Sequence, residues 1–282
     1  MSVDLIELQL AANVDSGELL AFLSSNDAIG AWESDGIVHV YWPRDRWSPR
    51  VVEDFEFALR RLGIDWGEVD IRIHEVVDRD WNEAWMKSIH PVEIGGRILI
   101  RQSWNPVVVR PGLAELIIDP KRAFGSGYHA TTRLLVEWIA DEICGGERVL
   151  DIGTGSGILA MTALRCGAAH AVGIDNDESA VECARENALL NGFGEELELR
   201  VGSVADICAC PFDLIVANLD RRTLLEISGR LRENLIESGK ALLSGLLEED
   251  CADLSEVLGA SGGRVKGKRT GDEWVALEVR FS

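Results

Sequence analysis

The segment that most constrains the fold is an apolar run that leads into a glycine-rich turn and then into an apolar helix pattern. Residues 149–160 read VLDIGTGSGILA, with glycines at Gly153, Gly155 and Gly157. Glycine adopts turn conformations that are barred to other residues and lets the backbone approach a ligand closely. The start of the following helix offers free N–H groups to a polar ligand group. The segment therefore predicts a strand–turn–helix unit that binds a ligand.

Apolar strands alternate with longer helices on both sides of this segment. We expect strands and helices in turn at 148–152, 158–166, 169–174, 179–190, 212–217, 223–235, 241–244 and 247–258. Strands that are nearly all apolar are typical of a parallel sheet covered on both faces, and alternating β and α units build a doubly wound α/β domain. Residues 264–268 and 274–281 are expected to add an antiparallel hairpin at the sheet edge.

The N-terminal part has a different pattern and predicts a smaller α+β domain. Strands are expected at 6–10, 28–32, 37–42 and 69–73, with helices opening near 15 and spanning 51–62. The order β-α-β-β-α-β is that of a ferredoxin-like sandwich. We therefore expect three parts, namely a domain over 1–77, a connector over 78–110 and the doubly wound domain over 111–282.

The charge balance restricts the partners. With 28 Lys and Arg against 48 Asp and Glu, the formal net charge is −20, which disfavours direct nucleic-acid binding because phosphate contacts need clustered cations. A basic protein partner suits this charge, although acidity that serves only solubility is an equal alternative. The N-terminus shows no secretory signal, and no membrane-spanning helix is expected. Six cysteines without a C-x-x-C pair predict reduced thiols in the cytoplasm and no metal site.

The glycine spacing and a downstream carboxylate narrow the class of ligand. Dinucleotide-binding loops read G-x-G-x-x-G, whereas this loop reads G-x-G-x-G and has Ile158 at the last position of that pattern. An NAD-dependent oxidoreductase is therefore disfavoured. Asp175 ends the next expected strand, 22 residues after Gly153, where a carboxylate accepts hydrogen bonds from ribose hydroxyls. A helix N-cap is the alternative role for Asp175, but Asp177 suits that role better.

Two further segments are expected at the same edge of the sheet. The strand 212–217 is followed by Asn218 and Asp220, and ligands in open α/β sheets bind outside the carboxyl ends of the strands. Upstream, residues 124–132 read FGSGYHATT just before an expected helix. This segment is interpreted as a lid that folds over the ligand, with a plain capped loop as the alternative.

Together these segments resemble the PrmA-type methyltransferases, which modify ribosomal protein eleven of the large subunit. The resemblance covers nearly the whole chain and is most specific at 118–132, IDPKRAFGSGYHATT, which in the family is close to PG-x-AFGTG-x-H-x-TT. The Trp81 and Trp85 pair in the connector and the run GKALLSG at 239–245 are also similar to the family. The resemblance implies a Rossmann-like class I methyltransferase domain behind a substrate-recognition domain.

The resemblance also implies a cofactor, S-adenosylmethionine, and the residues that hold it. Carried over by motif, the cofactor-binding residues are Thr132, Gly153, Asp175 and Asn218, and Phe124, Gly125 and Gly155 are expected to bind beside them. The acceptor is then an amino group, of a lysine or of the N-terminus, on ribosomal protein eleven. Asn218 would orient that amine, and Asp220 is a second candidate that would attract the cationic substrate or simply cap the next helix. A monomeric cytoplasmic enzyme is expected.

Two departures from the family leave the acceptor open. Asn218 is followed by Leu219-Asp220-Arg221-Arg222 where the family has apolar and small residues, and Lys121-Arg122 stand in the lid segment. The alternatives are a related methyltransferase that acts on another protein or a small molecule, and a non-catalytic module that binds S-adenosylmethionine without turnover.

Overall fold

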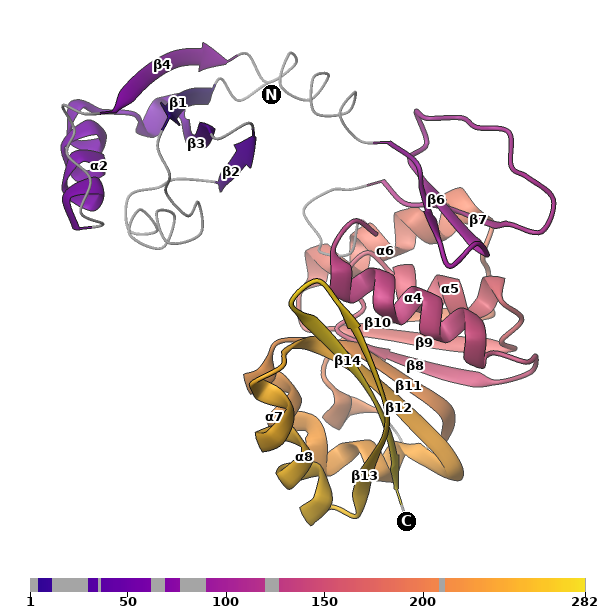
Figure 1. The fold of residues 1–282 in the computed structure, drawn as a ribbon. Coiled ribbons are helices and arrows are strands. Elements are labelled where there is room, and N and C mark those ends of the chain that lie inside the picture. Colours follow the sequence, from indigo (N-terminus) through magenta and orange to yellow (C-terminus); the bar gives the residue numbers. More distant parts are fainter. Residues whose placement is uncertain are drawn as a thin grey trace. The chain divides into compact units, whose positions relative to one another are not determined.

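The chain folds into two compact units, Met1–Ile89 and His90–Ser282, each with its own sheet and core (Figure 1). The computed structural model describes residues 5–11, 30–34, 37–61, 69–76, 90–119, 127–207 and 211–281.

The larger unit is built on a seven-stranded sheet. Its strands, in spatial order, are β10 (Leu197–Val201), β9 (His170–Asp175), β8 (Arg148–Ile152), β11 (Phe212–Asn218), β12 (Leu235–Leu247), β14 (Trp274–Phe281) and β13 (Gly263–Gly271). The first five strands run parallel, whereas β14 pairs antiparallel with both β12 and β13. The predicted doubly wound sheet with an antiparallel hairpin at its edge is therefore confirmed.

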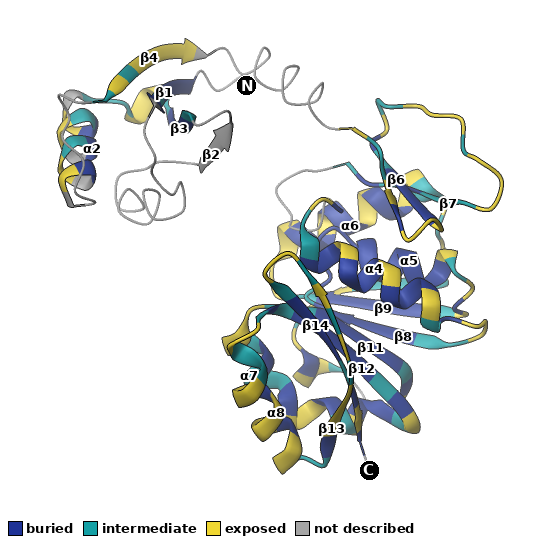
Figure 2. Cartoon of the chain, in the orientation of Figure 1, coloured by how far each residue is buried: buried dark blue, intermediate teal, exposed yellow. Residues whose placement is uncertain are grey.

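Helices cover both faces of this sheet (Figure 2). They are α4 (Ala130–Glu142), α5 (Ile158–Arg165) and α6 (Glu178–Asn191) on one face, and α7 (Arg221–Leu231) and α8 (Asp250–Ala260) on the other. Because successive strand residues point to opposite faces, Val149 of β8 joins the core under α4 and α5, while Leu150 and Ile152 join the core under α7 and α8. A strand buried on both faces is nearly all apolar, which is the pattern in the sequence.

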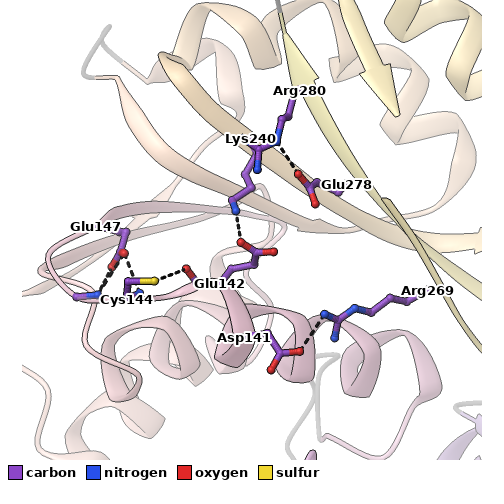
Figure 3. Close-up of polar contacts among 9 residues, drawn as sticks. Asp141, Glu142, Cys144, Glu147, Lys240, Arg269, Glu278 and Arg280 are labelled. Atoms are coloured by element: carbon purple, nitrogen blue, oxygen red, sulfur yellow. Dashed lines mark hydrogen bonds and ion pairs between the residues drawn. The ribbon is translucent and has the colours of Figure 1, made fainter. Parts of the chain in front are cut away.

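Ion pairs hold the end of α4 to the C-terminal strands of the sheet (Figure 3). Glu142 pairs with Lys240 of β12, and Asp141 pairs with Arg269 of β13 at 2.9 Å. The Arg269 guanidinium also lies over the Trp138 ring, 4.6 Å from its centroid. Partly exposed pairs contribute little stability each, so α4 is held mainly by its buried face, with Leu135, Val136 and Ile139 in the core. The other end of α4 faces the candidate site.

The larger unit also contains a second, three-stranded sheet, which was not expected from the sequence. It consists of β5 (Val92–Ile94), β6 (Ile98–Arg101) and β7 (Ala114–Ile117). Its buried side chains, Ile98, Ile100 and Leu116 among them, pack into the core under α4 and α5. Residues 90–101 of the expected connector are therefore folded with the larger unit, whereas Trp81 and Trp85 lie outside the described residues.

The smaller unit contains a four-stranded antiparallel sheet and a helix. The order is β2 (Gly30–Ser34), β3 (Ile37–Pro43), β1 (Leu5–Ala11) and β4 (Asp70–Val76), with α2 (Pro49–Arg61) between β3 and β4 in the chain. Its core includes Leu8, Leu10, Val40, Trp42 and Phe55. The first helix of the expected ferredoxin-like order falls outside the described residues, so that assignment stays a prediction, as do the domain boundaries.

Strand β12 has an irregularity that matters for the site. Its register with β14 shifts between Ser244 and Leu246, and Gly245 lies between them with φ +93°. A Cβ atom at Gly245 would collide with the backbone of Leu219, whose N–H donates to the Ser244 carbonyl at 3.0 Å. Only glycine meets both the conformation and the close approach here.

We therefore predict opposite effects from two glycine-to-alanine substitutions. Gly245→Ala should lower the free energy of unfolding by about 1–3 kcal/mol through strain and collision. Gly229→Ala, in α7 with no atom within 4 Å of the added methyl, should raise it by about 0.5–1 kcal/mol. Urea unfolding followed by circular dichroism measures both, and equal effects at the two positions would contradict the prediction.

Candidate active site

A cavity opens where the strand order of the large sheet reverses. Strand β8 lies between β9 and β11, and ligands bind at such a reversal, outside the carboxyl ends of the strands. The cavity has a volume of about 560 Å³. Its lining includes five residues singled out from the sequence, Gly153, Gly155, Asp175, Asn218 and Asp220.

The glycine loop needs its glycines for conformation and for packing. Gly153, Gly155 and Gly157 have φ values of +72°, +52° and +82°, a region that side chains other than glycine rarely adopt. A Cβ atom at Gly153 would collide with the Leu219 side chain, and one at Gly157 would lie 3.2 Å from the Cβ of Ala184 in α6. The loop is thus packed against Leu219, just after β11, and against α6, while Gly153 and Gly155 line the cavity.

A buried carboxyl group anchors the loop from below. Asp151 is fully buried, and its Oδ2 accepts hydrogen bonds from the Thr154 hydroxyl at 2.7 Å and from the Ala160 N–H at 3.1 Å. Its Oδ1 has no hydrogen-bond partner in the part of the chain that the structure describes. Burial, with a smaller contribution from the charge of Asp175, raises the pKa of Asp151 to about 7.

Asp175 is positioned to meet a sugar. It is the last residue of β9, and its Oδ2 accepts the Gly155 N–H at 2.9 Å while its Oδ1 accepts the Asp177 N–H at 3.0 Å. Each carboxylate oxygen keeps a further lone pair for a ligand. The helix cap is made instead by Asp177, whose Oδ1 accepts the Ser179 N–H at 2.8 Å, as the sequence indicated.

Asn218 and Thr132 form a pair across two elements. Asn218 ends β11 and lines the cavity, and its Nδ2 donates to the Thr132 hydroxyl at 3.2 Å. Thr132 itself is fully buried behind Asn218, while its neighbours His129 and Thr131 line the cavity. Because Thr132 engages the Nδ2 of Asn218, the Oδ1 of the same amide remains available to accept a hydrogen bond from a ligand.

Asp220 is the N-cap of α7. Its Oδ1 accepts the Thr223 N–H at 3.1 Å and its Oδ2 accepts the Thr223 hydroxyl at 2.7 Å. These hydrogen bonds, the hydroxyl bond first, lower the pKa of the Asp220 carboxyl. Of the two roles considered for Asp220, the capping role is therefore the one with direct contacts, although the side chain also borders the cavity.

The two arginines after Asp220 are engaged by helices rather than by the cavity. Arg221 forms ion pairs with two carboxylates of α8, Asp250 at 3.5 Å and Asp253 at a closer approach. Arg222 is 87% exposed and pairs with Glu226 one turn along α7 at 3.1 Å. Neither arginine is among the residues that line the cavity, so the charged run does not form a cationic patch in its wall.

Several lining residues were not identified from the sequence. Ser203 and Val204 follow β10, a half-exposed edge strand whose mixed composition gave no apolar run. Trp274 begins β14, and its ring packs edge-on against the His129 ring with centroids 4.9 Å apart. Two predicted cofactor residues, Phe124 and Gly125, lie outside the described residues.

Two further observations hold for the described ranges only. No helix there is long and apolar enough to span a membrane. No group of three or more His, Cys, Asp or Glu side chains there is arranged to hold a metal ion.

The cavity combines apolar wall with a carboxylate and open backbone groups, the combination that a nucleoside joined to a polar chain requires. Ile174 and Val204 supply apolar wall next to the Asp175 carboxylate, and the glycine loop opens the first turn of α5 to a polar group. With the doubly wound sheet and the G-x-G-x-G turn, this arrangement defines a class I methyltransferase, which uses S-adenosylmethionine.

Comparison with known proteins specifies the family. The family model for ribosomal protein L11 methyltransferase (PrmA) matches residues 25–282, and the chain belongs to this family. It is similar to ribosomal protein L11 methyltransferases of Symbiobacterium thermophilum, 36% identical over 78% of this chain and 71% of the relative, and of Xylella fastidiosa, 42% identical over 66% of this chain and 61% of the relative. The chain thus matches roughly two thirds of these relatives' lengths.

A solved structure supports the same fold. The ribosomal protein L11 methylase of Lactobacillus delbrueckii subsp. bulgaricus superposes with a TM-score of 0.64 at 28% sequence identity. The superposition covers 69% of this chain and 99% of that one.

The raised pKa of Asp151 predicts a pH-dependent stability effect. A carboxyl whose pKa is about 7 in the folded state and 3.8 as the reference value binds its proton more tightly when folded, so the wild-type protein loses stability as pH rises between these values. Asp151→Asn removes this loss because an amide does not ionise. Relative to wild type, the variant should gain roughly 2–3 kcal/mol between about pH 5 and pH 8, at 1.36 kcal/mol per pKa unit.

Chemical denaturation of both proteins across this pH range provides the measurement. The wild-type curve is the control, because every other ionisable group is common to both proteins. A free-energy difference that stays constant with pH would show that Asp151 is ionised throughout.

Proposed function

We propose that this chain transfers methyl groups from S-adenosylmethionine to amino groups of ribosomal protein L11, on lysine side chains or the N-terminus. The observation that carries the proposal is the convergence of Gly153, Asp175 and Asn218 on one cavity in a member of the L11 methyltransferase family.

The cofactor would be held by residues with different tasks. The two oxygens of Asp175 would accept the ribose hydroxyls, and Ile174 and Val204 would contact the base. Gly153 and Gly155 would let the polar chain of the ligand approach the backbone, with Phe124 and Gly125 adding contacts from the lid segment. When bound, S-adenosylmethionine supplies an electrophilic methyl group on a sulfonium.

The chain's own task is to present a neutral amine. A lysine amine has a reference pKa near 10.4, so it must lose a proton to water before it attacks the methyl carbon. The Oδ1 of Asn218 accepts a hydrogen bond from the amine and aims its lone pair, while Thr132 holds the Asn218 amide in place. Holding the amine and the methyl donor in line in this way is itself a large source of rate acceleration.

Asp220 contributes charge rather than proton transfer in this proposal. Its two oxygens are engaged by Thr223, and its lowered pKa makes it a poor proton acceptor. An ionised carboxylate beside the cavity nevertheless attracts a cationic substrate. The formal charge of −20 acts in the same sense on a basic partner at longer range.

The proposal extends to the setting of the reaction. The smaller unit would hold the ribosomal protein, as the family resemblance implies, and the enzyme would act in the cytoplasm as a monomer without direct nucleic-acid contacts. The charged run after Asn218 motivated a different acceptor as the alternative. Because Arg221 and Arg222 pair with carboxylates of α7 and α8, that observation no longer favours it.

Transfer of labelled methyl from S-adenosylmethionine to purified L11 tests the function, with Asp175→Asn as the informative variant. Losing a charged acceptor for two hydroxyls should weaken cofactor binding by roughly 10- to 100-fold, since a hydrogen bond to a charged group contributes about 1.5–3 kcal/mol. Labelling at limiting cofactor should fall in parallel, and calorimetry gives the Kd.

The matched control is Asp213→Asn. This carboxylate also accepts a backbone N–H in the same sheet, from Arg148 at 2.9 Å, but at the opposite end of the strands. Its substitution should leave the cofactor Kd within twofold. Cofactor binding without any labelling of L11 would retain the site and reject the acceptor, whereas unchanged binding in Asp175→Asn would reject the site.

A further inference from the structure

Helix α6 presents two asparagines to the small sheet. Asn191 forms a two-bond pair with Ile117 of β7, donating from Nδ2 to its carbonyl at 2.7 Å and accepting its N–H on Oδ1 at 2.8 Å. Asn187 accepts the N–H of Asp119 on Oδ1 at 3.1 Å. Four helical residues rise about 6 Å and two strand residues about 6.6 Å. The spacing of the two amides therefore matches that of the backbone groups they bind, at Ile117 of β7 and at Asp119 in the extended segment after it.

Asn187 makes one contact that Asn191 does not make. Its Nδ2 donates to the carbonyl of Ser156 in the glycine loop at 3.0 Å. Asn187 is fully buried and Ser156 is 2% exposed, so water does not replace this bond. A single buried amide thus joins the backbone that continues β7 to the backbone of the cofactor loop.

The carbonyl that Asn187 binds belongs to the Ser156–Gly157 peptide, whose N–H donates to the Thr154 carbonyl at 2.8 Å within the loop. Ser156 lies between two glycines, and peptides next to glycine change orientation at little cost. On one side the Gly155 N–H donates to Asp175 at 2.9 Å, and on the other Gly157 is the N-cap of α5. The Thr154 bond lies within the loop, whereas the bond from Asn187 ties the same peptide to α6 and thereby helps to set the position of the loop relative to the Asp175 carboxylate.

We propose that Asn187 is a positioning residue for the cofactor site, which holds the Ser156 peptide so that the glycine loop keeps its binding geometry. Asn191 attaches the small sheet to α6 and also contacts Arg165 and Met161 of α5, but its partners do not include the glycine loop. The proposal rests on the function argued above, because it assumes that this cavity binds S-adenosylmethionine.

Two alanine variants of the full chain separate the roles. Asn187→Ala and Asn191→Ala each remove hydrogen bonds between α6 and the β7 segment, so both should lower the Tm. Only Asn187→Ala should weaken binding of S-adenosylhomocysteine, at least tenfold by calorimetry, whereas Asn191→Ala should change the Kd less than twofold. Equal Kd values for the two variants would overturn the proposal.

A third variant tests whether the Asn187 side chain must donate to the Ser156 carbonyl. It also tests the proposal if Asn187→Ala does not fold. Asn187→Asp keeps an acceptor for the Asp119 N–H, but its ionised form has no proton to donate to the Ser156 carbonyl. The protonated acid does. The Kd ratio of Asn187→Asp to wild type should therefore rise at least fivefold from acidic to alkaline pH, and a flat ratio would overturn the proposal.

The wild-type measurement keeps this inference distinct from the function. Wild-type protein that binds S-adenosylhomocysteine but does not methylate L11 contradicts only the acceptor and leaves the role of Asn187 standing. Wild-type protein that does not bind it contradicts both the cofactor assignment and the role of Asn187.

Discussion

The parallel pairing of β8 with β9 on one side and β11 on the other is the constraint on which the site depends. Ile152 is in register with Ile174 and with Ala217, so the next residue of each strand emerges at the same level. Those residues are Gly153, Asp175 and Asn218. Helices cover both faces of the sheet, which leaves this edge as the place where three distant segments meet a ligand. The register of the backbone thus determines which three positions face the ligand, whatever side chains they carry.

This dependence explains what could be predicted. A central parallel strand is nearly all apolar and ends abruptly in glycine or a polar residue, so the carboxyl ends of β8, β9 and β11, at Gly153, Asp175 and Asn218, could be predicted. Edge strands lack that signal, because their outer side is exposed and their composition is mixed. The strand β10 was therefore missed, whereas the small sheet β5–β7 was missed because its strands are only three or four residues long. The cavity wall at Ser203 and Val204 was missed with them, since it follows β10.

Other features of the site depend on tertiary contacts that cannot be inferred from a single sequence. Adjacent residues of a helix point about 100° apart, so the sequence could not say that Thr132 would lie behind Asn218 while Thr131 faced the cavity. Two roles were equally compatible with Asp220, and only the position of Thr223 distinguishes them. The two amides of α6 illustrate the same limit, because both asparagines are visible in the sequence but their partners come from β7 and the glycine loop.

The contacts of Leu219 make three positions interdependent. Its side chain fills the space that a Cβ atom at Gly153 would need, and its backbone fills the space beside Gly245. A smaller side chain at position 219 would remove the collision with a Cβ atom at Gly153. It would not remove the collision at Gly245, because that one involves the backbone of residue 219. Substitutions at these sites should therefore combine non-additively. Residues 153, 219 and 245 therefore restrict one another, and sequence variation near the cavity should fall on other lining residues. The part of the cavity wall formed by Leu219 should stay the same while the residues around it change.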